Sequence, residues 1–132
     1  MYRNNQGRDV IMKIAIIGSR GIKNIVLEEF LPEGITEIVS GGAIGVDSLA
    51  RAYAKQHGLL LTEFLPDYQS YGRGAPLVRN NYIVDHADEV IAFWDGVSNG
   101  TRYVIDKCKK IGKKVTIYKF ASDGTVEKEI CD

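Results

Sequence analysis

The sequence predicts an α/β fold in which helices cover both faces of an open, mostly parallel sheet of about five strands. Two observations carry this prediction. Short, continuous apolar runs begin near residues 13, 36, 59, 89 and 114, and such runs are typical of strands that are buried on both faces. Their starts lie roughly 22–30 residues apart, which is the spacing of successive βα units in which a helix leads back to the next parallel strand.

The strands follow this pattern along the whole chain. The first has the sequence KIAII and ends at Gly18, and similar runs recur at four later positions. The expected strands are 13–17, 37–39, 59–64, 89–93 and 114–118. Their order in the sheet cannot be deduced from a single sequence.

Helix-period stretches fill the intervals between the strands. The clearest begins at Val46, carries apolar residues at positions i, i+3, i+4, i+7 and i+8, and ends at Gly58. Proline or glycine limits the others: Pro32 ends one, Pro76 suits the first turn of another, and Gly112 follows the last. The expected helices are 22–31, 46–57, 76–86 and 103–111.

The composition is that of one ordinary globular domain. The 132 residues are 45% hydrophobic and 26% charged, which excludes a disordered chain. We expect a domain over 13–119, a disordered or extended segment over 1–12, and a C-terminal tail or short edge strand over 120–132. No apolar run reaches the ~18–20 residues of a membrane span, and no signal-peptide pattern opens the chain. A cytoplasmic protein without a membrane partner is therefore expected.

Charge and cysteine content narrow the possible partners. Seventeen basic and seventeen acidic residues cancel, so bulk electrostatics do not favour binding to duplex nucleic acid. The two cysteines, Cys108 and Cys131, are too few for a disulfide framework or a four-thiolate metal site. Without H-x-x-E-H or a Cys/His cluster, no metal and no certain cofactor is expected. The P-loop and G-x-S-x-G motifs are also missing, which excludes those two classes of hydrolase.

The glycines are concentrated where strands are expected to end. Three clusters follow the first, second and fourth strands: Gly18 and Gly21, then Gly41, Gly42 and Gly45, then Gly96 and Gly100. Ligands of open α/β sheets bind at this carboxyl edge. Glycine lets the backbone approach an anion there, and helix N-termini present N–H groups to it. Turn geometry explains one such cluster, but three at the same edge favour a phosphate site.

Polar side chains accompany the first and third clusters. Ser19 offers a hydroxyl, and Arg20 either makes a bidentate contact with a phosphate or is an exposed arginine in a tight turn. Ser98 and Thr101 add hydroxyls beside the third cluster. Asp95 is either a ligand contact or a turn former.

The second cluster belongs to the segment 40–47, SGGAIGVD. Its small residues, including Ala43, leave room for a phosphate or a ribose beside a helix start. Asp47 lies in the first helical turn, where a carboxylate stabilises the helix dipole. The same carboxylate can instead accept hydrogen bonds from ribose hydroxyls, and both roles stay open.

These motifs together resemble those of the SLOG superfamily, and most of all its YspA/YpsA-related branch. The resemblance covers about residues 13–118 and rests on IGSR at 17–20, SGGAxGVD at 40–47, Tyr71-Gly72, Arg79-Asn80, Ala87-Asp88, AFWDG at 92–96 and SxGT at 98–101. It implies a Rossmann-like three-layer sandwich. It also implies a site for a nucleotide or nucleotide-derived ligand, ADP-ribose-like, NAD-like or a nucleoside phosphate, in a sensor or carrier. Because sister families associate through helix faces, a homodimer is expected.

The resemblance adds Arg79 and Asn80 to the candidate site. Arg79 would reach a phosphate, and Asn80 would bond to a ribose or to another loop; the alternative is a surface arginine beside a polar residue on the side of a helix. The candidate ligand-binding residues are Gly18, Ser19, Arg20, Gly41, Gly42, Ala43, Gly45, Asp47, Arg79, Asn80, Asp95, Gly96, Ser98, Gly100 and Thr101.

Two other functions remain open. The cytokinin phosphoribohydrolases of the superfamily carry a Pro-Gly-Gly-x-Gly-Thr loop followed within a turn by a catalytic glutamate. Here the loop lacks the proline, and no carboxylate lies within three residues after Thr101. The candidate catalytic residues of an N-glycosidic-bond hydrolase or transferase are then Asp95 and Asp47. A single-stranded DNA binder similar to the DprA proteins needs a basic face, for which the chain offers only the lysine cluster at 107–114.

The connection 65–75 is too long and too aromatic for a simple turn. Tyr68 and Tyr71 in it belong either to a lid that places a tyrosine against a base or to a loop that packs down on the domain. Trp94, the sole tryptophan, either walls the pocket or packs in the core or against another subunit. His57 and His86 are expected to be structural.

Overall fold

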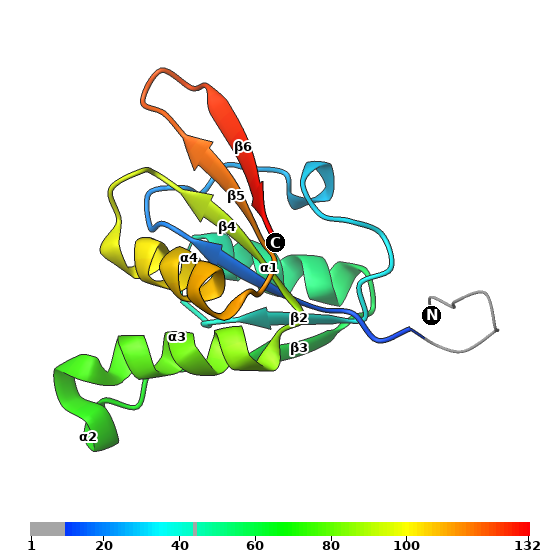
Figure 1. Ribbon diagram of the computed structural model, residues 1–132. Helices are drawn as coiled ribbons and strands as arrows, with labels where there is room; N and C mark the ends of the chain where they lie inside the picture. The colour runs from blue at the N-terminus through cyan, green and yellow to red at the C-terminus, as the bar shows by residue number, and fades with distance from the viewer. Residues whose placement is uncertain (1–9, 44) are drawn as a thin grey trace.

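The structure, a computed structural model, describes residues 10–43 and 45–132. Most of the expected N-terminal segment 1–12 lies outside them. The described residues form one sheet with the order β3-β2-β1-β4-β5-β6, in which every neighbouring pair is parallel except β5 and β6 (Figure 1). The strands are β1 (Lys13–Gly18), β2 (Glu37–Ser40), β3 (Leu60–Glu63), β4 (Glu89–Trp94), β5 (Val115–Phe120) and β6 (Val126–Cys131).

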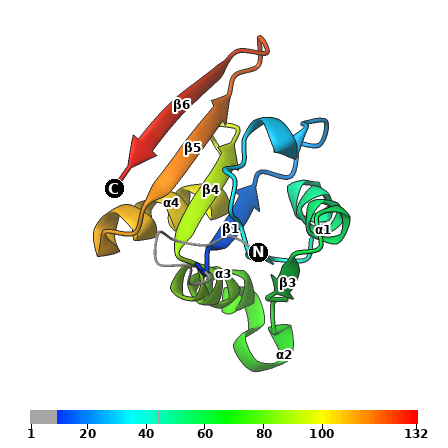
Figure 2. The same ribbon diagram turned by 90° about the vertical axis from the view of Figure 1, so that its right-hand side faces the viewer.

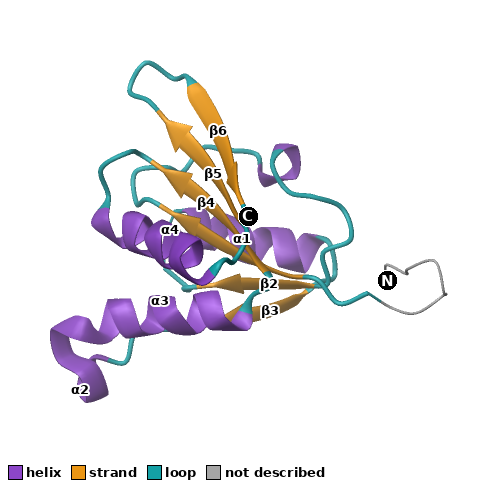
Figure 3. Ribbon diagram, in the orientation of Figure 1, coloured by secondary structure: helices purple, strands orange, loops and turns teal. Residues whose placement is uncertain are grey.

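Helices cover both faces of this sheet, so the expected α/β three-layer fold is confirmed. The α-helices are α1 (Val46–Gln56), α2 (Tyr68–Tyr71), α3 (Ala75–His86) and α4 (Asn99–Ile111), and the short 3-10 helices are η1 (Leu27–Glu29) and η2 (Gly72–Gly74). Helices α3 and α4 lie on one face, and α1 lies on the other together with the segment around η1 (Figures 2 and 3). Among the described residues, no helix has the length and apolar character that a membrane span needs.

The alternation of side chains along β1 supplies both halves of the core. Ala15 and Ile17 pack under α3 and α4, whereas Ile14 and Ile16 pack under α1. All four are at most 8% exposed. A strand with apolar residues on both faces must lie in the middle of a covered sheet, and this is why the first strand reads as an uninterrupted apolar run.

The strand order creates a crevice at the carboxyl end of β1. The chain runs from β1 outward through β2 to β3, and then crosses back to place β4 on the other side of β1. Gly18 at the end of β1 pairs with Phe93 near the end of β4. The loops that leave these strands therefore diverge toward opposite faces, which is the position where ligands of doubly wound folds bind.

The prediction of a helix at 22–31 is wrong. Of these residues only Leu27–Glu29 form a helical turn, of the 3-10 type. Ile22, Ile25 and Val26 are β-branched and lose side-chain freedom in a helix. The irregular path instead lets the Phe30 ring pack edge-on against aromatic rings of β4 and β5, at centroid distances of 5.4 Å and 4.8 Å.

The C-terminal residues form a strand rather than a tail. Strand β6 pairs antiparallel with β5 from Phe120↔Val126 to Val115↔Cys131 and forms one edge of the sheet. Most of its side chains are exposed. This strand makes six in the sheet, where about five were expected, and the additional strand lies at the edge remote from β3.

Candidate functional site

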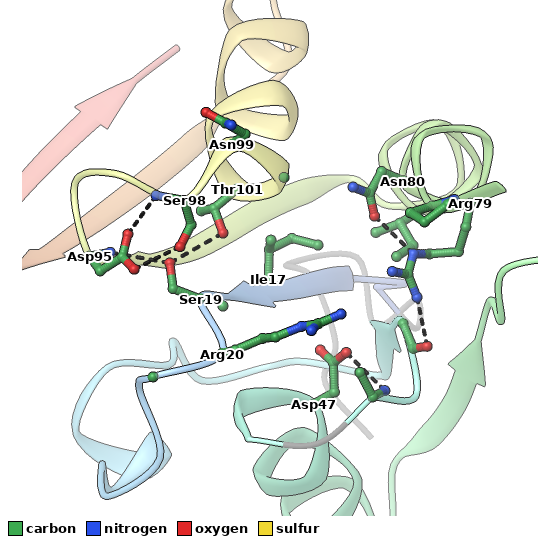
Figure 4. A pocket seen from close by; sticks show the side chains of 17 residues that line it. Ile17, Ser19, Arg20, Asp47, Arg79, Asn80, Asp95, Ser98, Asn99 and Thr101 are labelled. Carbon is green, nitrogen blue, oxygen red and sulfur yellow. Dashed lines mark hydrogen bonds between the residues drawn. The ribbon is translucent and has the colours of Figure 1, made fainter. Parts of the chain in front are cut away.

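A cavity of about 460 Å³ opens at the carboxyl edge of the sheet, in the crevice beside β1 (Figure 4). Its size falls within the roughly 300–1,000 Å³ of small-molecule sites. The loops after β1, β2 and β4 and one side of α3 line it. Gly42, Gly45 and Gly96 are not among the lining residues, whereas all the other candidate ligand-binding residues are: Gly18, Ser19, Arg20, Gly41, Ala43, Asp47, Arg79, Asn80, Asp95, Ser98, Gly100 and Thr101.

The cavity has further lining residues that are not among the candidate ligand-binding residues. Ile17 and Asn99 lie inside the motifs at 17–20 and 98–101, and Pro76 and Ile83 come from α3. With Arg79, the two α3 residues follow the i, i+3, i+7 spacing of one helix face. Counting this spacing from Pro76 would have identified them from the sequence. Gly21, a member of the first glycine cluster, also lines the cavity.

Ser19 joins the loop after β1 to the loop after β4. Its residue is 2% exposed, and its N–H donates to the carbonyl of Phe93 at 2.9 Å. Its hydroxyl accepts from the N–H of Asp95 at 3.2 Å and lies 3.4 Å from the hydroxyl of Thr101. Gly18 beside it has a packing role, because a Cβ there would lie 2.4 Å from the Cβ of Val46 in α1.

The Asp95 carboxylate closes the turn between β4 and α4. Its Oδ1 accepts from the N–H groups of Val97 and Ser98 at 2.9 Å and 2.7 Å, and its Oδ2 accepts from the Ser98 hydroxyl at 2.6 Å. Burial acts to raise the pKa of Asp95, but these hydrogen bonds outweigh it and lower the pKa below its ordinary value of 3.8. Both oxygens of Asp95 are therefore engaged in holding the loop.

The first turn of α4 presents backbone donors to the cavity. Within the described residues, the N–H groups of Asn99, Gly100 and Thr101 have no hydrogen-bond acceptor, and all three residues line the cavity. The positive end of the helix dipole lies at the same place. A Cβ on Gly100 would meet nothing within 4 Å, so contacts among the described residues do not explain this glycine.

Asp47, in the first turn of α1, also lines the cavity, but its surroundings differ from those of Asp95. Its Oδ2 accepts from the N–H of Ala43 at 3.0 Å. Burial raises the pKa of Asp47 above 3.8, and neither this hydrogen bond, nor the nearby Ser40 hydroxyl, nor the charge of Arg79 cancels this effect. The carboxylate is thus held partly buried at an electrostatic cost.

The two arginines of the cavity differ in what they contact. Arg79 donates through Nη1 to the Gly41 carbonyl at 2.9 Å and to the Phe64 carbonyl at 3.4 Å. A Cβ on Gly41 would lie 2.6 Å from that nitrogen, so Gly41 permits the contact. Arg20 makes no hydrogen bond or ion pair with the described residues, and Figure 4 shows its side chain extended across the cavity toward the side of Asp47.

The three glycines outside the cavity are explained by backbone conformation. Gly42, Gly45 and Gly96 have φ angles of +70°, +79° and +87°, which side chains other than glycine rarely adopt. At these positions the turn geometry accounts for the glycine without a ligand.

The aromatic connection before α3 is not placed as a lid. Tyr68 and Tyr71 lie in α2, which extends beyond the end of α3 (Figure 1), and neither lines the cavity. Tyr71 instead shares a hydrogen bond of 3.3 Å with the hydroxyl of Tyr82 in α3. Trp94 does not line the cavity either; its ring nitrogen donates to the Ser98 carbonyl at 3.1 Å and supports the turn.

Most of the lysines at 107–114 have partners. Lys113 donates to the carbonyls of Val84 and Ala87 at the end of α3. Three others lie near carboxylates, in the pairs Lys107–Asp85 at 3.3 Å, Lys109–Glu129 at 3.9 Å and Lys114–Glu89 at 3.3 Å. Within the described residues, no three His, Cys, Asp or Glu side chains gather as metal ligands do.

Comparison of the sequence with protein-family models gives no match, and no curated protein matches it either.

Proposed function

We propose that the protein binds a phosphorylated nucleoside or a related nucleotide-derived ligand in the cavity at the carboxyl edge of its sheet. The observation that carries this proposal is a set of donors without acceptors. The N–H groups of Asn99, Gly100 and Thr101 and the guanidinium of Arg20 all border one cavity and have no partner among the described residues. A phosphate group satisfies such donors and complements the helix dipole.

The rest of the cavity suits the uncharged part of such a ligand. Ile17 and Ile83 give it an apolar side, and Asp47 and Asn80 add polar groups. A carboxylate with an oxygen available can accept hydrogen bonds from vicinal ribose hydroxyls. A site with an anionic end and a mixed apolar and polar end favours a nucleotide over a simple anion.

Membership of the SLOG superfamily is part of the same proposal. Its support is the clustering of motif residues that are far apart in sequence: members of the segments 17–20, 40–47, 79–80 and 98–101 all line one cavity. A sensor or carrier role follows from this resemblance and from the lack of a carboxylate near Thr101 in α4.

Ligand titration of an Arg20→Ala variant tests the phosphate contact. Loss of a charged hydrogen bond costs about 1.5–3 kcal/mol, so AMP should bind about 10–100-fold more weakly to the variant. Adenosine should bind equally to both proteins because it carries no phosphate. Arg51→Ala is a matched control, since Arg51 pairs with Glu63 and does not line the cavity. Equal losses for AMP and adenosine, or no loss for AMP, would contradict the proposal.

Cleavage of an N-glycosidic bond is a second candidate function, and the state of Asp47 favours it. Burial raises the pKa of Asp47, and a raised carboxyl pKa favours a role as a general acid. Asp95 is a poor candidate for this chemistry because both of its oxygens hold the turn. If the protein is an N-glycosidase, incubation with AMP releases adenine, and Asp47→Asn abolishes the release. No adenine above the blank would exclude this activity on AMP.

Binding of single-stranded DNA is less well supported. It needs a continuous basic face, whereas the described lysines of the one cluster mostly contact carboxylates or backbone carbonyls. A salt-dependent shift of single-stranded DNA by the protein would restore this interpretation.

A further inference from the structure

Asn80 presents unused hydrogen-bond donors to the cavity. The residue lies in α3, is 9% exposed and lines the cavity. Its Oδ1 accepts from Arg79, whereas its Nδ2 donates to no atom of the described residues. Among the described residues, every fully buried side-chain nitrogen or oxygen has a hydrogen-bond partner. Because Nδ2 of Asn80 has no such partner, this atom is not fully buried. The cavity is the open space that Asn80 borders, so we infer that Nδ2 faces it.

The orientation of the Asn80 amide depends on Arg79. The Nε–H of Arg79 donates to Oδ1 of Asn80 at 2.9 Å. An arginine has only donors, so it accepts no hydrogen bond from the NH₂ end of the amide. Rotating the amide by 180° would bring two donors together and break the contact. Arg79 thus selects the orientation in which the two N–H bonds of Asn80 point away from it.

Arg79 is itself anchored by the loops behind it. Its Nη1 donates to the carbonyls of Gly41 and Phe64, which follow β2 and β3. Figure 4 shows Asn80 and Arg79 on one side of the cavity and Asp95, Ser98 and Thr101 on the opposite side. Asn80 therefore lies across the cavity from the N–H groups of α4 that have no acceptor.

We propose that Asn80 is a specificity-determining residue that donates to an acceptor oxygen on the sugar or base of the ligand, and that Arg79 is a positioning residue that sets the Asn80 amide rather than a phosphate contact. The inference rests on the proposed nucleotide site and deepens it. The group it selects is a hydroxyl, ether or carbonyl oxygen that accepts a hydrogen bond, at the end of the ligand remote from the phosphate.

The test uses two probes, AMP and inorganic phosphate, and three variants. Arg79→Lys keeps the positive charge but loses the Nε donor, and Asn80→Leu keeps similar volume but loses both N–H donors. Arg51→Lys is the matched control outside the cavity. We expect Arg79→Lys and Asn80→Leu to bind AMP about tenfold or more weakly, while Arg51→Lys binds AMP like the wild type. Inorganic phosphate should bind all four proteins equally.

Two results would overturn the inference. One is an AMP affinity in Arg79→Lys equal to that of the wild type, which would mean that only charge matters at this position. The other is a parallel loss of AMP and inorganic phosphate, which would place Arg79 or Asn80 on the phosphate.

A ligand-independent measurement separates this inference from the proposed function. In the protein without ligand, the side-chain ¹H–¹⁵N resonances of Asn80 should shift and broaden in Arg79→Lys but not in Arg51→Lys. Unchanged resonances would overturn the positioning role. If the resonances change but the wild type binds neither probe, the nucleotide site and the recognition role of Asn80 both fail, and only the positioning contact stands.

Discussion

The loops after β2 and β4 are built alike but hold their aspartates in opposite ways. Each loop leaves a buried strand, contains glycines and enters a helix with an aspartate beside the cavity. Asp95 receives three hydrogen bonds within its own turn, and its pKa is lowered below the ordinary value despite burial. Burial raises the pKa of Asp47, and its hydrogen bonds do not compensate.

This difference separates a structural carboxylate from a candidate functional one. A group that the fold stabilises in its charged form contributes to stability, as Asp95 does. A group whose charged form is buried without full compensation lowers the stability of the folded protein. Such groups are concentrated at binding and catalytic sites. The comparison therefore favours Asp95 as a structural residue and Asp47 as the candidate for a ligand contact.

The largest effect is expected at Gly41, on the Asp47 side. In Gly41→Ala the new Cβ would lie 2.6 Å from Nη1 of Arg79 and 3.1 Å from Oδ2 of Asp47. Displacing Arg79 breaks its charged hydrogen bond to the Gly41 carbonyl, at a cost of about 1–3 kcal/mol. Urea unfolding measures this loss. A variant as stable as the wild type would show that Arg79 moves without consequence.

A somewhat smaller loss is expected for Asp95→Ala. Removing the Asp95 carboxylate leaves the N–H groups of Val97 and Ser98 without their acceptor, which costs about 1–2 kcal/mol. For a domain of this size, that corresponds to a fall in Tm of about 4–8 °C. Asp95→Asn is the matched control, because its amide oxygen still accepts from Val97 and Ser98. An unchanged Tm in Asp95→Ala would remove the contrast between the two loops.

Gly100→Ala should stabilise the protein. Gly100 is the second residue of α4, and a Cβ there meets no described atom within 4 Å. Alanine is favoured over glycine in helices, so stability should rise by up to about 1 kcal/mol. If the ligand's phosphate approaches this backbone, AMP binding should weaken at the same time. A destabilised variant would mean that the glycine serves the fold.

The smallest effect is expected for Asp47→Asn, and it depends on pH. Because burial raises the pKa of Asp47 in the folded protein above 3.8, the folded state binds the proton more tightly than the unfolded state. Stability due to this group is therefore full below pH 3.8 and is lost as pH rises through the folded pKa. The stability of Asp47→Asn should equal that of the wild type at pH 3.5 and exceed it at pH 7. A lower stability than the wild type at pH 7 would contradict the assignment of Asp47.

The sequence predicted the strands well because each central strand is buried on both faces. β1 and β4 show this as unbroken apolar runs, and their positions in the structure match those expected to within a residue at each end. The segment 22–31 misled because its apolar residues follow a helix-like spacing although they pack irregularly against β4 and β5. Strand order and the pairing of β6 with β5 depend on contacts between distant segments, which no local pattern encodes.

The site was predictable to the extent that it lies at strand ends. Motif residues after β1, β2 and β4 could be placed together because parallel strands end at one edge. Whether a given glycine serves a turn, as Gly42 does, or faces the cavity, as Gly100 does, depends on backbone angles that composition does not reveal. The contact of Arg79 with the Gly41 carbonyl likewise required coordinates, because these two residues are far apart in sequence and no local pattern indicates their contact.

A thermal-shift panel tests the central claim most directly. The wild type is heated with AMP, ADP, ATP, NAD, ADP-ribose and cyclic nucleotides, with adenosine as the unphosphorylated control, and each sample is then analysed for released base. A ligand at ~100 times its Kd adds about 2.7 kcal/mol, or several degrees of Tm for a domain of this size. We predict such a shift for at least one phosphorylated ligand and a smaller shift for adenosine at the same concentration. No shift with any phosphorylated compound, or an equal shift with adenosine, would contradict the account.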